Sequence, residues 1–232
     1  MKIIYTAVGR FHRKATVRRL SCPVIFVGQQ EYAVDMQEMI LWTVLNSRIL
    51  ELHQIDEYYR SKAAEVGYAT HRSWDACLQR LRQRGLVAAG TGETGEDALY
   101  SLLSCLYVIP VSNSTLLRVI IFLKSTLLGR MSVSVAKHLF ARPSMSGCER
   151  QVYHLSGQAL LSTAEMVKCI EKKAVDLSTS DKLMDVIYDD DETTSDNIAS
   201  LVRCMDSCQP VLLAVANLYL SRQIIFDRGD AA

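Results

Sequence analysis

The sequence predicts a mainly α-helical protein with a small β component. Apolar residues recur at helical spacing over most of the 232 residues, and capping residues or glycines flank many of these segments. Short apolar runs at 23–34 and 107–111 are the candidate strands. With 49% hydrophobic and 22% charged residues, the chain can bury at least one full core, so intrinsic disorder is excluded for most of it.

The composition favours a cytoplasmic protein without a membrane span. No stretch reaches the ~18 uninterrupted apolar residues that a span needs. Residues 1–19 are basic but lack the apolar core of a secretory signal. The seven cysteines form no CxxC pair and lie mostly among apolar residues, which indicates buried thiols in a reducing compartment.

Basic charge is concentrated at the start of the chain, although the overall net charge is only +1. Residues 1–30 contain no acidic residue, and their basic residues are Lys2, Arg10, Arg13, Lys14, Arg18 and Arg19. This basic arm suits contact with phosphates, but lysine and arginine also protect the edge of a sheet against pairing with another strand. The sequence does not decide between phosphate contact and protection of a sheet edge.

The first part of the chain is expected to contain a hairpin and two helices. Two apolar runs around Gly28 predict a hairpin over 23–35. Asp35 is then a suitable N-cap for a helix over 36–48. A second helix is predicted over about 51–66, and Gly67 is expected to end it.

A third helix is predicted over 71–84, with Thr70 as its cap and Gly85 as its end. Its apolar stripe consists of Trp74, Cys77, Leu78 and Leu81. If this stripe is buried, the outward positions are Arg72, Ser73, Ala76, Gln79, Arg80 and Gln83, with Arg82 and Arg84 to the sides. Arginine and glutamine side chains match the edges of guanine and adenine in the major groove of DNA.

A glycine-rich loop and a strand pair are expected after this helix. The apolar run at 86–89 leads into a loop at 90–97 that contains three glycines and two threonines. A helix over 97–106 and a strand over 107–111 follow. We expect the two strands to pair, with the loop and the helix inserted between them.

The segment from about 35 to 111 resembles winged helix-turn-helix transcriptional regulators of the broad MarR-like and PadR-like kind. The resemblance rests on LWTVL in the first helix, the turn GYAT, the segment HRSWDACLQRLRQRGLV and the glycine-rich loop after it. It implies that the helix at about 70–84 enters the major groove and that 90–95 is the tip of the wing. The helix over 97–106 stands where the simplest members have a short strand. The DNA-binding residues are then Thr70, His71, Arg72, Ser73, Ala76, Gln79, Arg80, Gln83, Arg84, Thr91 and Thr94.

The expected organisation is an N-terminal winged helix-turn-helix domain over 1–111 and an all-helical domain over 112–232. Apolar helices near 116–123 and 211–226 suit a homodimer interface, or alternatively the core of a monomeric domain. Aromatic and methionine residues in this half suit either a pocket for a small-molecule effector or core packing. They are Tyr153, His154, Met166, Tyr188 and Met205. Helices are predicted at about 115–128, 131–140, 146–156, 160–175, 179–188, 194–206 and 210–226.

Enzyme motifs are missing from the sequence. GTGETG has neither the lysine of a phosphate-binding P-loop nor GxGxxG spacing, and there is no HExxH or GxSxG. We therefore expect no enzyme activity, no cofactor and no metal site. The predicted function is a homodimeric, sequence-specific regulator of transcription that binds double-stranded DNA. The alternatives are a winged-helix interaction or scaffold module without DNA binding, and a plasmid-type replication initiator, which requires a second winged domain.

Overall fold

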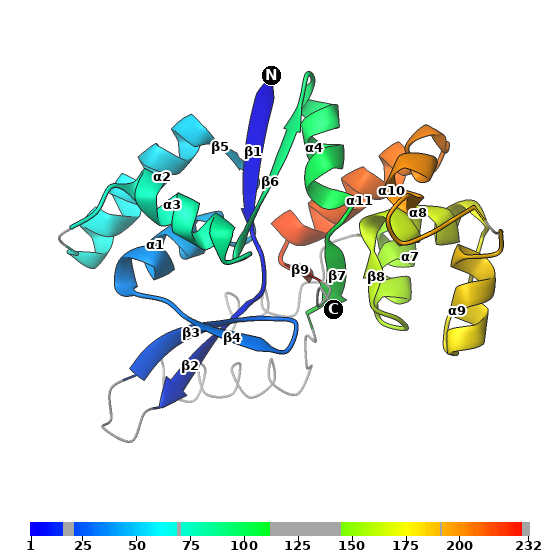
Figure 1. Ribbon diagram of the computed structural model, residues 1–232, viewed down its shortest axis with the longest axis horizontal. Helices are drawn as coiled ribbons and strands as arrows, with labels where there is room; N and C mark the ends of the chain where they lie inside the picture. The colour runs from blue at the N-terminus through cyan, green and yellow to red at the C-terminus, as the bar shows by residue number, and fades with distance from the viewer. Residues whose placement is uncertain (16–20, 69–70, 112–144, 191, 229–232) are drawn as a thin grey trace, which may run out of the picture.

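Helices and small antiparallel sheets alternate along the chain (Figure 1). The computed structural model describes residues 1–15, 21–68, 71–111, 145–190 and 192–228. The first half contains β1 (Lys2–Ala7), β2 (Arg10–Ala15), β3 (Ser21–Val27), β4 (Gln30–Ala33), α1 (Met36–Leu45), β5 (Leu50–Glu51), α2 (Leu52–Val66), α3 (Trp74–Gln83), β6 (Val87–Gly92) and α4 (Gly95–Leu103). The second half contains β7 (Tyr107–Pro110), α7 (Gly147–Ser156), β8 (Leu161–Ser162), α8 (Thr163–Glu171), α9 (Ser180–Ile187), α10 (Ile198–Leu201), the 3-10 helix η2 (Val202–Cys204), α11 (Cys208–Leu220) and β9 (Ile224–Asp227).

The predicted hairpin and the first two helices are confirmed. β3 and β4 pair as an antiparallel hairpin whose turn contains Gly28 at a φ of 57°. Asp35 caps α1 through a capping box, because its side chain accepts the Glu38 amide while the Glu38 side chain accepts the Asp35 amide. Gly67 ends α2 in the left-handed conformation, at a φ of 66°.

The third helix begins later than predicted, at Trp74, with Ser73 as its N-cap. Gln37 on α1 explains the late start. Its side-chain nitrogen donates to the Arg72 carbonyl at 2.6 Å, and its side-chain oxygen accepts the Arg72 amide at 3.2 Å. Both backbone groups of Arg72 are therefore engaged outside the helix. Thr70, the predicted cap, lies outside the described residues.

The predicted pairing of the strands near 87 and 107 is wrong. β6 pairs with β1, whereas β7 pairs with β8 and β9. The glycine-rich segment belongs to β6, on which α4 packs directly. A Cβ at Gly90 would lie 2.3 Å from the Ala98 carbonyl oxygen, and one at Gly92 would lie 2.3 Å from the Ala98 nitrogen. These glycines therefore allow close helix packing and do not form a wing tip.

The expectation of an all-helical second half is also wrong. β8, β7 and β9 form a three-stranded antiparallel sheet, and β7 joins it from before residue 111. The helix predicted up to 226 ends at Leu220, and Ile224–Asp227 is a strand. Periodicity does not separate helix from strand in such short apolar runs. The helices predicted at 115–128 and 131–140 lie outside the described part of the chain.

The two halves repeat one arrangement of elements. The sheet orders β5-β1-β6 and β8-β7-β9 match. The registers match as well: Ile4 pairs with Glu51 and Gly90, while Tyr107 pairs with Ser162 and Asp227. α1 and β5 begin at residues 36 and 50, and α7 and β8 begin at 147 and 161. α3 leads into β6 as α11 leads into β9, so α11 is the counterpart of α3.

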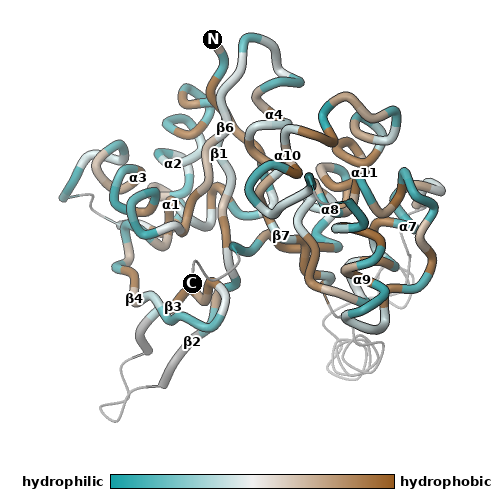
Figure 2. Tube along the Cα trace, turned by 45° about the vertical axis from the view of Figure 1, so that its right-hand side comes forward, coloured by the Kyte–Doolittle hydropathy of each residue, from teal (hydrophilic) through white to brown (hydrophobic). Residues whose placement is uncertain are grey.

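The halves share one hydrophobic core. α11 is one of its hydrophobic segments and packs on α7 and α8 (Figure 2). The Tyr219 hydroxyl lies 2.9 Å from the Thr6 hydroxyl and accepts the Ser47 amide at 3.0 Å, which joins α11 to the first half. This apolar helix is therefore largely covered by its own chain, although Leu213 and Leu220 are each 50% exposed. Its buried residues are Cys208, Val211, Leu212, Ala214, Val215, Ala216, Leu218 and Tyr219.

Among the described helices, none alone has the length and hydropathy of a membrane span. Ile198–Cys204 and Cys208–Leu220 meet these criteria only when they are taken together across a bend of 111°.

Candidate nucleic-acid interface

α3 is fixed by one narrow apolar side, as predicted, although Trp74 of the predicted stripe is only partly buried. Cys77, Leu78 and Leu81 are buried, and α3 packs on α1 beside α2 (Figure 1). Ser73 accepts the Ala76 amide at the start of the helix. The opposite side of α3 is open to solvent; its exposed residues are Asp75, Ala76, Gln79, Arg80, Arg82 and Gln83.

Two of the predicted DNA-contacting arginines bind a buried carboxylate. Glu38 on α1 is only 1% exposed. Its Oε1 lies 3.0 Å from Arg80 Nε and its Oε2 lies 3.2 Å from an Arg84 nitrogen. The Arg84 guanidinium also lies 5.7 Å from the centre of the Tyr32 ring on β4. These arginines therefore fix α3 to α1 and to the neighbouring sheet.

Arg72 has a similar internal partner, because it forms an ion pair with Asp35. Burial by itself raises the pKa of Asp35, but hydrogen bonds from the Glu38 amide and from Arg72 together lower it below its ordinary value. The N-cap of α1 is thus tied to the residue that precedes α3. The Arg72 side chain therefore stabilises the junction between α1 and α3.

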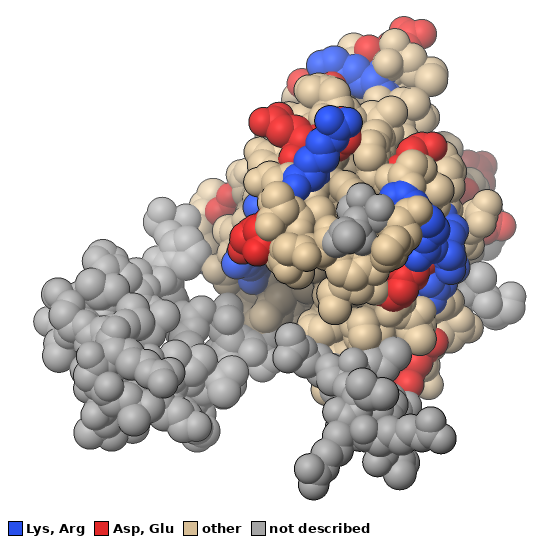
Figure 3. Space-filling model, turned by 90° about the vertical axis from the view of Figure 1, so that its left-hand side faces the viewer, with Lys and Arg blue, Asp and Glu red and all other residues tan. Residues whose placement is uncertain are grey.

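Gln79, Gln83 and Arg82 are the side chains of α3 best placed to meet a partner. Both glutamines are exposed. The Arg82 guanidinium lies 5.7 Å from the centre of the Tyr5 ring, within reach of solvent. His71 and Ser73 are exposed near the start of the helix, and Asp75 adds a negative charge there. On the side of the molecule seen in Figure 3, basic and acidic side chains are interspersed.

Thr91 and Thr94 are not brought next to α3. Thr91 pairs with Ile3 in the sheet, and Thr94 caps α4 by accepting the Asp97 amide at 3.1 Å. The turn between β6 and α4 lies at the end of β6 remote from α3 (Figure 1). The predicted wing is therefore not part of this surface.

Part of the basic arm belongs to a sheet next to the end of α3, a position that the sequence alone did not predict. β2, β3 and β4 are antiparallel, and the far end of the β2 and β3 pair points away from the helices (Figure 1). Arg84 links β4 to the end of α3 through its position over Tyr32. Arg10 is exposed on β2. The residues between β2 and β3 lie outside the described part of the chain.

A comparison of the chain with protein-family models, with curated proteins and with solved structures gave no match. Within the described residues, no group of three or more His, Cys, Asp or Glu side chains is arranged to hold a metal ion.

Proposed function

We propose that this chain is a regulator of transcription that binds double-stranded DNA through α3. The observation that supports this function is a short helix held on one side by α1 and open on the other, with Gln79, Arg82 and Gln83 facing solvent. A helix fits the major groove, and glutamine can form two hydrogen bonds with adenine. The paired arginines Arg72, Arg80 and Arg84 serve to hold the helix at its angle.

The β2 and β3 hairpin is proposed as a second contact, in place of the wing. Residues 1–30 contain no acidic side chain, and the sheet adjoins the end of α3. Phosphate contacts by basic residues position a protein on a duplex without reading its sequence. In this arrangement α3 supplies specificity and the basic arm supplies affinity.

A homodimer in the cytoplasm remains part of the proposal. A single α3 buries too little surface for useful specificity, so a second copy is needed on a symmetric site. Because most of α11 is covered by its own chain, only its exposed residues, such as Leu213 and Leu220, are available to a second copy. The six cysteines that the structure describes are unpaired, which fits a reducing compartment.

A protein-interaction module is the second candidate. The mixed charges in Figure 3 and Asp75 on the open side of α3 favour a protein partner over a polyanion. In this alternative the exposed glutamines would contact a polar protein surface.

Titration with mixed duplex DNA at two salt concentrations separates the two candidates. A DNA-binding protein should bind with strong salt dependence, and Arg82→Ala should reduce the salt slope by about 1. Arg150→Ala, at an exposed position of α7 in the second half, is the charge-matched control and should leave the slope unchanged. If the wild type shows no affinity at low salt, the interaction module is the correct function.

A further inference from the structure

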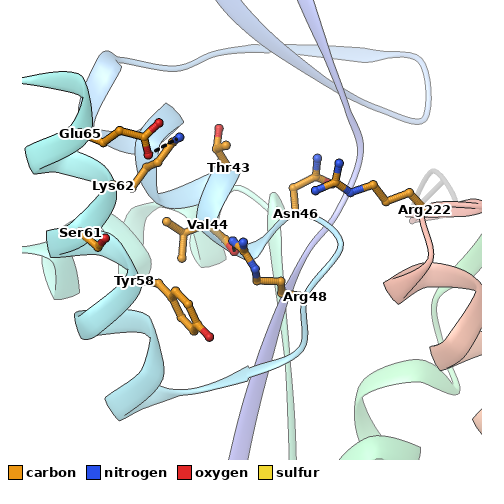
Figure 4. Close-up of a pocket in the computed structure, with 9 residues that line it drawn as sticks. All are labelled: Thr43, Val44, Asn46, Arg48, Tyr58, Ser61, Lys62, Glu65 and Arg222. Carbon is orange, nitrogen blue, oxygen red and sulfur yellow. Dashed lines mark hydrogen bonds and ion pairs between the residues drawn. The ribbon is translucent and has the colours of Figure 1, made fainter. Parts of the chain in front are cut away.

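A polar pocket of about 450 Å³ lies where the two halves meet (Figure 4). α1, α2 and the segment after α1 form most of it, and the turn between α11 and β9 contributes one residue from the second half. Its volume is in the range of small-molecule sites. The lining residues are Thr43, Val44, Asn46, Arg48, Tyr58, Ser61, Lys62, Glu65 and Arg222.

Three cationic side chains from three segments reach this pocket. The Arg48 guanidinium lies 5.1 Å from the centre of the Tyr58 ring and donates to the Val44 carbonyl at 3.0 Å. Lys62 forms an ion pair at 2.8 Å with Glu65, the one carboxylate in the lining. Arg222 points toward the pocket from the opposite side and has no ion pair with a described residue (Figure 4). The lining therefore has an excess of positive charge.

The backbone at the pocket is held in an unfavourable conformation at two positions. Ser47, between two lining residues, has a φ of 57°, and Arg222 has a φ of 60°. At the matching turn of the first half, between α3 and β6, the left-handed residue is Gly85, with a φ of 73°. Glycine adopts this conformation without steric cost, whereas arginine does not. The left-handed non-glycine residues among those described, Ser47, Lys173 and Arg222, each follow the C-terminus of a helix, where this conformation is common.

We propose that this pocket binds the phosphate group of an anionic ligand. Two guanidinium groups can hold phosphate oxygens through paired, charge-assisted hydrogen bonds. The Lys62 ammonium adds a third positive charge, and the Asn46 amide adds a neutral donor. The phosphate belongs either to a free phosphorylated small molecule or to the backbone of a nucleic acid.

Calorimetric titration with pyrophosphate tests the site. The wild type should bind it saturably, and Arg222→Gly should weaken binding by roughly tenfold or more, because a charged hydrogen-bonding partner is lost. The same variant should unfold at an equal or higher temperature, because glycine relieves the backbone. A variant that fails to fold is thereby distinguished from one that fails to bind.

Lys173→Gly is the matched control, because it removes one exposed positive charge at a φ of 55° outside the pocket. It should bind pyrophosphate like the wild type. The proposal is overturned if the wild type does not bind pyrophosphate, if Arg222→Gly binds it normally, or if Lys173→Gly loses binding equally.

Duplex DNA distinguishes the two sources of phosphate. If the ligand is a free molecule, Arg222→Gly loses pyrophosphate binding but keeps the affinity and salt slope of the wild type for DNA. If the pocket holds a nucleic-acid phosphate, the variant loses both, and DNA competes with pyrophosphate in the wild type. Both results support a phosphate site and identify its occupant.

Discussion

At the scale of single residues, the pairing of Glu38 with Arg80 and Arg84 decides how α3 is held. The carboxylate is buried, while the arginine side chains are 51% and 28% exposed. Replacing both arginines, Arg80→Ala with Arg84→Ala, removes the cationic partners of this buried carboxylate and leaves it the hydrogen bond from the Asp35 amide. The free energy of unfolding in urea should fall by about 1–3 kcal/mol, less than for a fully buried pair, because water screens the half-exposed Arg80.

Two comparisons test this explanation. Adding Glu38→Gln to the double variant should restore part of the lost stability, because burying a neutral amide costs less free energy than burying a carboxylate that lacks a cationic partner. Arg60→Ala removes an exposed ion pair with Asp56 and should cost less than about 1 kcal/mol. A double variant as stable as Arg60→Ala would show that the buried pairing contributes nothing.

The sequence predicted the buried side of α3 but not the use of its arginines. Cys77, Leu78 and Leu81 recur at helical spacing, and this spacing alone identifies the side that is covered. The partners of Arg72 and Arg84 are Asp35 and Glu38, which lie far away in the sequence. Their proximity depends on how α1 and α3 cross, which a local pattern does not contain.

At the scale of elements, the glycines of β6 determine how closely α4 packs. Gly90→Ala should destabilise the protein by about 1–3 kcal/mol or more, because its Cβ would meet the Ala98 carbonyl. Gly95→Ala is the control at the first residue of α4, where the nearest atom is Lys2 Nζ at 3.9 Å. Thermal unfolding should show a lowered melting temperature for the first variant only. Equal melting temperatures would contradict the close approach of α4.

A second element-scale contact joins α8 to the acidic segment after α9. Lys168 is 4% exposed and lies 3.1 Å from Asp189 and 3.0 Å from Asp190. Hydrogen bonds from Thr193 and Lys168 lower the pKa of Asp190 well below its ordinary range.

The pairing of Lys168 with Asp190 should make the stability of the fold decrease at low pH. Because the folded pKa of Asp190 is depressed, its stabilisation is present above the unfolded pKa of about 4 and is lost as pH falls below it. Asp190→Asn should therefore be less stable than the wild type at pH 7, and the difference should shrink below about pH 4. Unfolding in urea at several pH values measures this difference. A gap that is constant with pH would rule out ionised Asp190 as its source.

At the scale of the whole molecule, the repeat of the two halves could not be found as a sequence period. The first half has a sheet between β1 and α1, and the second has α9, α10 and η2 between α8 and α11. The spacing is kept only from α1 to the start of α2, and insertions elsewhere prevent one period from running through the chain. Short common features remain, such as Glu38 and Glu149 in the capping boxes of α1 and α7.

The corresponding helices of the two halves differ in their exposure to solvent. α3 exposes polar side chains, whereas α11, its counterpart, is mostly buried and is anchored to the first half through Tyr219. Burial raises the pKa of Tyr219 to about 12, as expected for a hydroxyl in the core. We therefore assign the proposed DNA contact to α3 and not to its counterpart in the second half.

The most direct test of DNA recognition by α3 is selection of bound sequences from a random duplex pool, followed by affinity measurements with Gln79→Ala and Gln83→Ala. We expect the wild type to enrich a defined sequence, and each variant to bind it about 1–3 kcal/mol more weakly while binding a scrambled duplex as before. Failure to enrich any sequence, or equal affinity of the variants and the wild type for the enriched duplex, would contradict the proposed role of α3.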